Sequence, residues 1–289
     1  AVRLAAACRL LSLSLSASAS ASAPDAGEEE REAFSFPPDD AYDLAVAVAA
    51  GCSPASAAAR RWVARGDRVY LAGRSVERLR ILGVALETGA GSVAGCHAFE
   101  AHAVDGHVAL IEAGRAALGS LDVVLVAHGF LGDQQASERD FATADAILRT
   151  NLNDTIALLI PLANALDAQG YGTLGVITSV AADRGRPRNY TYAAAKGALN
   201  VYLEGLRTRL GPAVRVVTLK VGPTDTPMTA GHRKHPLFAS AEQVARGVVA
   251  ALDGPAGVRY VPRRWRAIMA LVRQVPDPIF RRVPFLGGR

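Results

Sequence analysis

From about residue 44 onward, short apolar runs alternate with amphipathic stretches, and this alternation constrains the fold more than any other feature of the sequence. The run Val123-Val124-Leu125-Val126 is apolar at every position, as expected for a strand that helices cover on both faces. Strands are predicted over residues 44–50, 68–72, 92–98, 122–127, 173–178, 214–220 and 257–261. Helices are predicted over residues 55–65, 106–118, 145–168 and 190–210. The repeated β-α-β order indicates an α/β fold, with a single doubly wound parallel sheet and helices on both of its faces.

Composition divides the 289 residues into three parts. Residues 1–40 form a low-complexity segment with a linker, residues 41–262 the α/β domain, and residues 263–289 a basic amphipathic tail. The first 24 residues contain Arg3 and Arg9, no acidic residue and a run of Ser and Ala. This composition is typical of an organelle transit peptide, of a weak secretory signal or of a disordered tail, and all three interpretations stay open. We therefore expect a location in the cytoplasm or inside an organelle.

The formal net charge of +5 is concentrated near the C-terminal end. From Arg259 onward, eight arginines stand against one acidic residue, Asp277, so the preceding residues together carry a charge of −2. A nucleic-acid partner is therefore not expected. Apolar residues of the tail recur at helical spacing at Trp265, Ile268, Met269, Val272 and Val275. Such a basic helix could contact a membrane surface or a lipid phosphate, or it could pack over the core as a lid.

Cysteine and histidine are too scattered to form a recognisable framework. Cys8, Cys52 and Cys96 show no C-x-x-C pair, which argues against a disulfide scaffold or a zinc site and favours a reducing compartment. The six histidines show no metal-ligand spacing, so we expect no metal. No run reaches the ~18 consecutive apolar residues of a membrane-spanning helix.

Ligands of a doubly wound sheet bind beyond the carboxyl ends of its strands. After the first predicted strand, Gly51 can form a tight turn, and Ser53 opens a run of small residues that would let a pyrophosphate approach the helix N-terminus. The usual second and third glycines of such a turn are alanines here, so the signal is weak. An ordinary turn between a strand and a helix would look the same.

The next three strand ends also carry residues that suit a dinucleotide. Arg74 follows the second strand, where arginine suits the 2′-phosphate of NADP(H) rather than the free ribose hydroxyl of NAD(H), although a solvated turn arginine is the alternative. Glu100, after the third strand, could accept a hydrogen bond from adenine. After the fourth strand, Ala127 and Gly129 would let the backbone touch a ribose, and we interpret His128 between them as a positioning residue.

The strongest chemical signal follows the fifth predicted strand. Ser179 ends that strand, Tyr192 comes thirteen residues later, and Lys196 follows four residues further on a predicted helix. Positions i and i+4 share a helix face, so the phenol and the ammonium can converge on one point. An ammonium nearby favours the phenolate, which lets tyrosine exchange a proton with a carbonyl or alcohol oxygen. Ser179 would hold that oxygen by a hydrogen bond.

With these residues in place, the chain from about 44 to 262 resembles the short-chain dehydrogenase/reductase family, whose catalytic domain is a Rossmann-type fold. The resemblance implies catalytic roles for Ser179, Tyr192 and Lys196, and it adds Asn151 as the holder of a water in a proton relay from the lysine. The family's motif after the sixth strand appears as Gly222-Pro223-Thr224-Asp225-Thr226, where Thr226 would bind the nicotinamide. Three departures are the alanines of the glycine turn, His128, and Val221 in place of a proline.

The resemblance implies a nicotinamide-dependent oxidoreductase that transfers hydride between the cofactor and a carbonyl or secondary alcohol, with NADP(H) favoured over NAD(H). Residues 161–170, 183–186, 189–192, 226–229, 265–270 and 276–280 are also similar to a bacterial subgroup that includes the keto-reductase of decaprenylphosphoryl-arabinose formation. We therefore expect a small-molecule or lipid-linked carbonyl substrate, such as a keto-sugar, and a homo-oligomer. A non-catalytic NAD(P)-binding protein on the same fold is the alternative.

Overall fold

Seven parallel strands form one sheet in the order β3-β2-β1-β4-β5-β6-β7. The computed structural model describes residues 45–48, 53–87, 90–229 and 234–282. The strands are β1 (Ala45–Val48), β2 (Arg68–Gly73), β3 (Ser92–Ala98), β4 (Val123–Val126), β5 (Gly172–Ser179), β6 (Val214–Val221) and β7 (Gly257–Val261). The strand order reverses between β1 and β4, and an open parallel sheet binds its ligand at this switch point. The predicted doubly wound α/β fold is confirmed.

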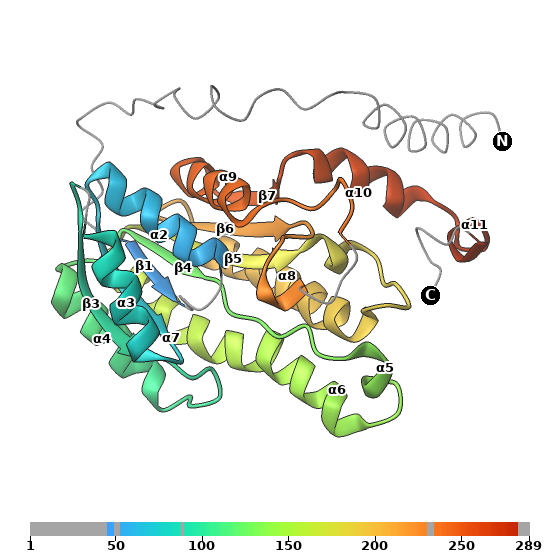
Figure 1. Cartoon of the computed structure of the whole chain (residues 1–289), viewed down its shortest axis with the longest axis horizontal. Coiled ribbons are helices and arrows are strands. Elements are labelled where there is room, and N and C mark those ends of the chain that lie inside the picture. The colour runs from blue at the N-terminus through green and yellow to red at the C-terminus, as the bar shows by residue number, and fades with distance from the viewer. Residues whose placement is uncertain (1–44, 49–52, 88–89, 230–233, 283–289) are drawn as a thin grey trace.

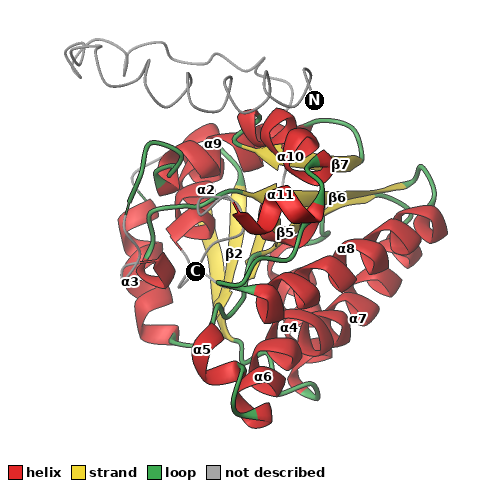
Figure 2. Ribbon diagram, turned by 90° about the vertical axis from the view of Figure 1, so that its right-hand side faces the viewer, coloured by secondary structure: helices red, strands yellow, loops and turns green. Residues whose placement is uncertain are grey.

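Two layers of helices cover the sheet (Figures 1 and 2). One layer consists of α2 (Ser53–Arg65), α3 (Val76–Leu86) and α9 (Ala241–Asp253), and the other of α4 (Gly106–Leu118), α7 (Asp154–Gln169) and α8 (Tyr190–Leu210). Strand β2 contributes alternate side chains to the two layers, so that Val69 and Leu71 pack on one side and Tyr70 and Ala72 on the other. Helix α9 begins at the capping box predicted from Ser240 and Gln243.

The single helix predicted over residues 145–168 is wrong in its extent and continuity. The chain forms α6 (Phe141–Leu148), a π-helical turn η3 (Arg149–Asn153) and then α7. Hydroxyl and amide groups bond backbone carbonyls around this turn: Thr150 to Ala146, Asn151 to Ile147, and Thr155 to Thr150. Such bonds compete with the regular backbone ladder, and they account for the wider turn.

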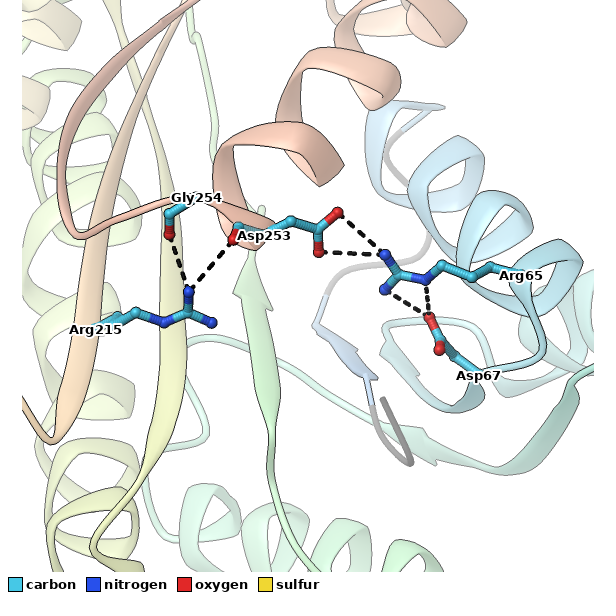
Figure 3. Close-up of polar contacts among 5 residues, drawn as sticks. All are labelled: Arg65, Asp67, Arg215, Asp253 and Gly254. Carbon is cyan, nitrogen blue, oxygen red and sulfur yellow. Dashed lines mark hydrogen bonds and ion pairs between the residues drawn. The ribbon is translucent and has the colours of Figure 1, made fainter. Parts of the chain in front are cut away.

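A buried ion-pair network joins the ends of several elements on the edge of the sheet opposite the strand carboxyl ends (Figure 3). Arg65, the last residue of α2, contacts Asp67 at 2.7 Å and Asp253, the last residue of α9, at 3.1 Å. Arg215 of β6 donates hydrogen bonds to the carbonyls of Asp253 and Gly254. Burial lowers the pKa of Arg65, but its bonds to Asp67 and Asp253 outweigh this and raise it.

The tail folds onto the body of the protein as α10 (Arg264–Gln274) and α11 (Asp277–Arg282). Trp265, Met269 and Val272 of its predicted apolar stripe are buried in a cluster with Val180 and Phe280. The stripe therefore contacts the chain itself, as the lid interpretation requires. No helix within the described residues has the length and apolar character needed to cross a membrane.

Candidate active site

Ser179 and most of the predicted cofactor-binding residues lie where consecutive strands end. Ser53 opens α2 after β1, and the remaining positions follow β2 to β6: Arg74, Glu100, Ala127, Gly129, Ser179, Gly222, Thr224 and Thr226. Because all seven strands are parallel, their carboxyl ends meet at one edge of the sheet. Gly51 lies outside the described residues. The topology therefore brings the cofactor-binding and catalytic candidates to the same side of the molecule.

Lys196 has an unusual environment for a charged side chain. Only 2% of it is exposed, and its Nζ donates a hydrogen bond to the Ile177 carbonyl in β5 at 3.3 Å. Tyr192, partly buried, lies one turn earlier on α8. Ser179 ends β5, and its Oγ accepts a hydrogen bond from the Ala181 backbone N–H at 3.1 Å. Helix α8 begins at Tyr190 and ends at Leu210, as predicted, so phenol and ammonium share one helix face.

Asn151 lies in the π-helical turn and is completely buried. Its Oδ1 accepts a hydrogen bond from the Phe130 N–H at 3.1 Å, and its Nδ2 donates to the carbonyls of Phe130 and Ile147 at 2.6 and 2.8 Å. A Cβ added to Gly129 would lie 3.0 Å from Asn151 Oδ1 and 3.5 Å from Lys196 Nζ. The end of β4, the π-helical turn and Lys196 are thus neighbours, and glycine leaves the space between them.

His128 is held as a neutral ring beside these groups. Its Nε2 lies 3.0 Å from Thr155 Oγ1, and its ring centroid is 5.5 Å from that of Phe99. Burial, and then the positive charge of Lys196, lower the pKa of His128 to about 3. A histidine with this pKa is not a proton donor at neutral pH. The geometry favours the positioning role expected from the sequence.

Arg184, which the sequence analysis did not single out as a site residue, joins the tail to the segment after Ser179. It follows the short 3₁₀ helix η4 (Val180–Asp183). Its guanidinium donates to the carbonyls of Val272 and Val275, pairs with Asp277 at 2.7 Å and stacks 3.8 Å from the Phe280 ring centroid. The hydrogen-bond partners lie 88 to 93 residues away, which is why local sequence patterns did not reveal the contact.

The preceding residue, Asp183, forms a second connection of the same segment. Its carboxylate pairs with Lys220 of β6 and accepts a hydrogen bond of 2.7 Å from the Tyr260 hydroxyl of β7. Burial, and then this hydrogen bond, raise the pKa of Tyr260 to about 12, so the phenol remains a donor. The segment that leads from Ser179 toward Tyr192 is therefore fixed by the sheet as well as by the tail.

A surface cavity of about 620 Å³ lies beside the start of α8. Its lining residues come from the end of the short helix α5 (Gln134–Ser137) and from the segment before α8: Glu138, Gly185, Arg186, Pro187 and Tyr190. Gln134 exchanges two hydrogen bonds with Thr191, at 3.0 and 3.3 Å, and so links α5 to α8. The cavity is bordered by the same first helical turn that carries Tyr192.

The strand ends fit a dinucleotide in three respects. Arg74 is exposed directly after β2, and the position is not acidic. Gly129 leaves open space beside Asn151 and Lys196. The loop after β6 turns back on itself, because Thr224 Oγ1 donates to the Gly222 carbonyl at 3.0 Å and the Thr226 N–H donates to Thr229 Oγ1 at 3.2 Å. Gly222 has a packing role as well, since a Cβ there would lie 2.0 Å from the Trp265 indole nitrogen. No group of three or more metal-binding side chains occurs among the described residues.

Fold and site together define a class, the nicotinamide-dependent α/β oxidoreductases. Residues 44–237 match the sequence model of the short chain dehydrogenase family. An uncharacterized oxidoreductase of Mycobacterium tuberculosis is 32% identical over 247 residues, which cover 85% of this chain and 99% of the relative. The chain belongs to the short-chain dehydrogenase/reductase family and is an NAD(P)-dependent oxidoreductase.

Solved structures show the same fold. A short chain dehydrogenase from Burkholderia cenocepacia in complex with NADP has a TM-score of 0.70 at 21% identity, covering 83% of this chain and 96% of that one. A short chain dehydrogenase from Mycobacterium paratuberculosis bound to NAD has a TM-score of 0.68 at 19% identity, covering 76% and 96%. The two neighbours were solved with different nicotinamide cofactors, NADP in the first and NAD in the second.

Proposed function

We propose that this enzyme reduces a carbonyl with Tyr192 as proton donor, or oxidises the corresponding alcohol with the same residue as base. The observation that carries the proposal is the buried Lys196 ammonium, one helical turn from Tyr192 and next to Asn151 and Gly129. An ammonium in this position favours the phenolate and so promotes proton exchange with the substrate oxygen. Ser179 would hold that oxygen, and Asn151 would keep the lysine and the end of β4 in place. A bound nicotinamide supplies or accepts the hydride.

The cofactor preference and the substrate class extend this proposal. Arg74 after β2 favours NADP(H), because a guanidinium matches a 2′-phosphate. Gly51, Ser53, Glu100, Ala127, Gly129, Gly222, Thr224 and Thr226 are proposed to line the cofactor. A keto-sugar or lipid-linked carbonyl is the proposed substrate, on the similarity of residues 183–186 and 226–229 to the bacterial subgroup. Three further points stay predictions: that the protein forms a homo-oligomer, that its tail contacts a membrane, and that it is located in the cytoplasm or inside an organelle.

Replacing Tyr192 by Phe tests the proposal, because it removes one hydroxyl and leaves the ring. Turnover of NADPH with a panel of ketones and keto-sugars should fall by about 10²- to 10⁴-fold, the usual contribution of a general acid. Cofactor affinity, measured by fluorescence titration with NADPH, should be retained. Tyr171→Phe is the matched control, since Tyr171 is exposed and lies directly before β5, at the edge of the sheet away from the strand carboxyl ends. Undiminished turnover by Tyr192→Phe would remove Tyr192 from the mechanism.

A further inference from the structure

Arg186 is a largely enclosed cation whose hydrogen-bonding capacity is mostly unused. Its Nη2 donates to the sulfur of Met269 in α10 at 3.8 Å. Its Nε is buried without a hydrogen-bond partner among the described residues. Thioether sulfur is a weak acceptor, and an enclosed guanidinium without good acceptors is unfavourable. A ligand that brings oxygen acceptors would remove this cost.

The contrast with Arg184, two residues earlier, makes the environment of Arg186 specific. Arg184 has two carbonyls and the Asp277 carboxylate as partners. Arg186 has the opposite electrostatic surroundings, because burial and then the positive charge of Arg188 lower its pKa. Two arginines on one short segment therefore have different roles. Arg184 holds the tail, whereas the charge of Arg186 is not used within the described part of the chain.

Arg186 also lines a cavity beside the first turn of α8, the turn that carries Tyr192. It lines the cavity of about 620 Å³ together with Glu138, Pro187 and Tyr190. Tyr190 begins α8 two residues before Tyr192, and the segment containing Arg186 joins Ser179 to that helix. A group bound by Arg186 would thus belong to a molecule positioned at the reacting end of α8. Exposed Arg188 adds a second positive charge to the same segment.

We propose that Arg186 anchors an oxyanion of the substrate, a phosphate or a carboxylate, in the cavity beside Tyr190. This inference rests on the proposed function, since it assigns the substrate of the same active site. The planar guanidinium offers parallel N–H groups that match the oxygens of either anion. Glu138 on the cavity wall disfavours a second anionic group nearby. The favoured substrate is therefore a carbonyl compound with one anionic group.

Matched pairs of ketones test the proposal on the full chain with NADPH. Dihydroxyacetone is compared with dihydroxyacetone phosphate, and 2-pentanone with 4-oxopentanoate, so that each pair isolates one kind of anion. A charge-assisted hydrogen bond of about 1.5–3 kcal/mol predicts at least a tenfold higher kcat/KM for one of the two anionic ketones. Arg186→Met, which keeps the apolar stem against Met269, should remove that preference. Arg246→Gln, an exposed arginine of α9, should keep it.

A direct measurement of anion binding tests the role of Arg186 independently of turnover. Calorimetric titration of the NADPH-saturated protein with inorganic phosphate, and separately with acetate, should show binding that weakens at least tenfold in Arg186→Met. Arg186→Lys, which keeps the charge but loses the fork, should bind with intermediate affinity and provides a second variant if Arg186→Met unfolds. If no ketone is turned over but anion binding depends on Arg186, the proposed function fails and the anion site stands. Anion binding and ketone preference that are the same with and without Arg186 would overturn the inference.

Discussion

The amide of Asn151 connects the loop after β4 to the π-helical turn before α7. It bonds both backbone groups of Phe130 after β4 and the Ile147 carbonyl one turn earlier on its own helix. Each such bond contributes about 0.5–1.5 kcal/mol, and a buried partner that loses its bond costs more. Asp at this position would lack the two amide donors. The residue therefore fixes the local geometry beside Lys196.

At the same scale, Arg74 should determine the choice of cofactor. Arg74→Ala removes the guanidinium next to the proposed 2′-phosphate, and charge-assisted contacts of about 1.5–3 kcal/mol predict at least a tenfold rise in KM for NADPH. KM for NADH should change far less, because NADH has no phosphate there. Steady-state kinetics with both cofactors provide the measurement, and Arg115→Ala on α4 controls for the loss of a surface charge. Equal changes in KM for NADPH and for NADH would show that Arg74 does not contact the 2′-phosphate.

Among the elements, α10 joins the tail to the segment that follows Ser179. Its residues Trp265, Met269 and Val272 are buried, and its last carbonyls are held by Arg184 in the segment after Ser179. The arginines of the tail point mostly outward, as the exposure of Arg266, Arg273 and Arg281 shows. The helix therefore has an apolar inner face that packs on the body of the protein and a charged outer face that is exposed. The inner face affects stability, and the outer face is available for a partner surface.

Removal of the tail should destabilise the protein. A chain that ends at Pro262 loses four buried apolar side chains, each worth about 1.5–3 kcal/mol, and exposes Val180 next to Ser179. We expect a clear fall in Tm by differential scanning calorimetry and a loss of turnover. Flotation of both forms with neutral and with anionic vesicles tests the outer face separately. A truncated chain with unchanged Tm and turnover would contradict the lid role.

At the scale of the whole molecule, the Arg65 network joins elements from both halves of the chain at the edge of the sheet away from the active site (Figure 3). Arg65→Met leaves Asp67, which is fully buried, without its cation, and breaking a buried pair typically costs about 3–5 kcal/mol. We expect a lower free energy of unfolding in urea, with cofactor affinity retained. The exposed Arg209–Asp167 pair is the control, because Arg209→Gln should cost at most about 1 kcal/mol. Similar losses of unfolding free energy in Arg65→Met and Arg209→Gln would contradict the expected difference between the two ion pairs.

The parts of the fold that depend on local patterns were predictable from the sequence. The strand positions and the bounds of α4 and α8 follow from hydrophobic periodicity, and Tyr192 and Lys196 were placed on one helix face by their spacing alone. The π-helical turn at Asn151 was not predictable, because its hydrogen bonds to Phe130 depend on how β4 packs against the helix. In the sequence, Arg186 stood out only as part of residues 183–186, which are similar to the bacterial subgroup. Its contact with Met269 is visible only in the tertiary structure. Contacts between residues distant in sequence determine the π-helical turn and the environment of Arg186, and hydrophobic periodicity carries no information on such contacts.

The match to the family ends at residue 237, whereas the folded unit continues through α9, β7 and α10. A recombinant protein trimmed to the matched region would keep Ser179, Tyr192 and Lys196 but would lose β7, the neighbour of β6. Strand β6 would then become an open edge, and long uncovered edge strands promote intermolecular pairing and aggregation. The region that the family model matches is therefore shorter than the region that must be expressed together for a soluble, active enzyme.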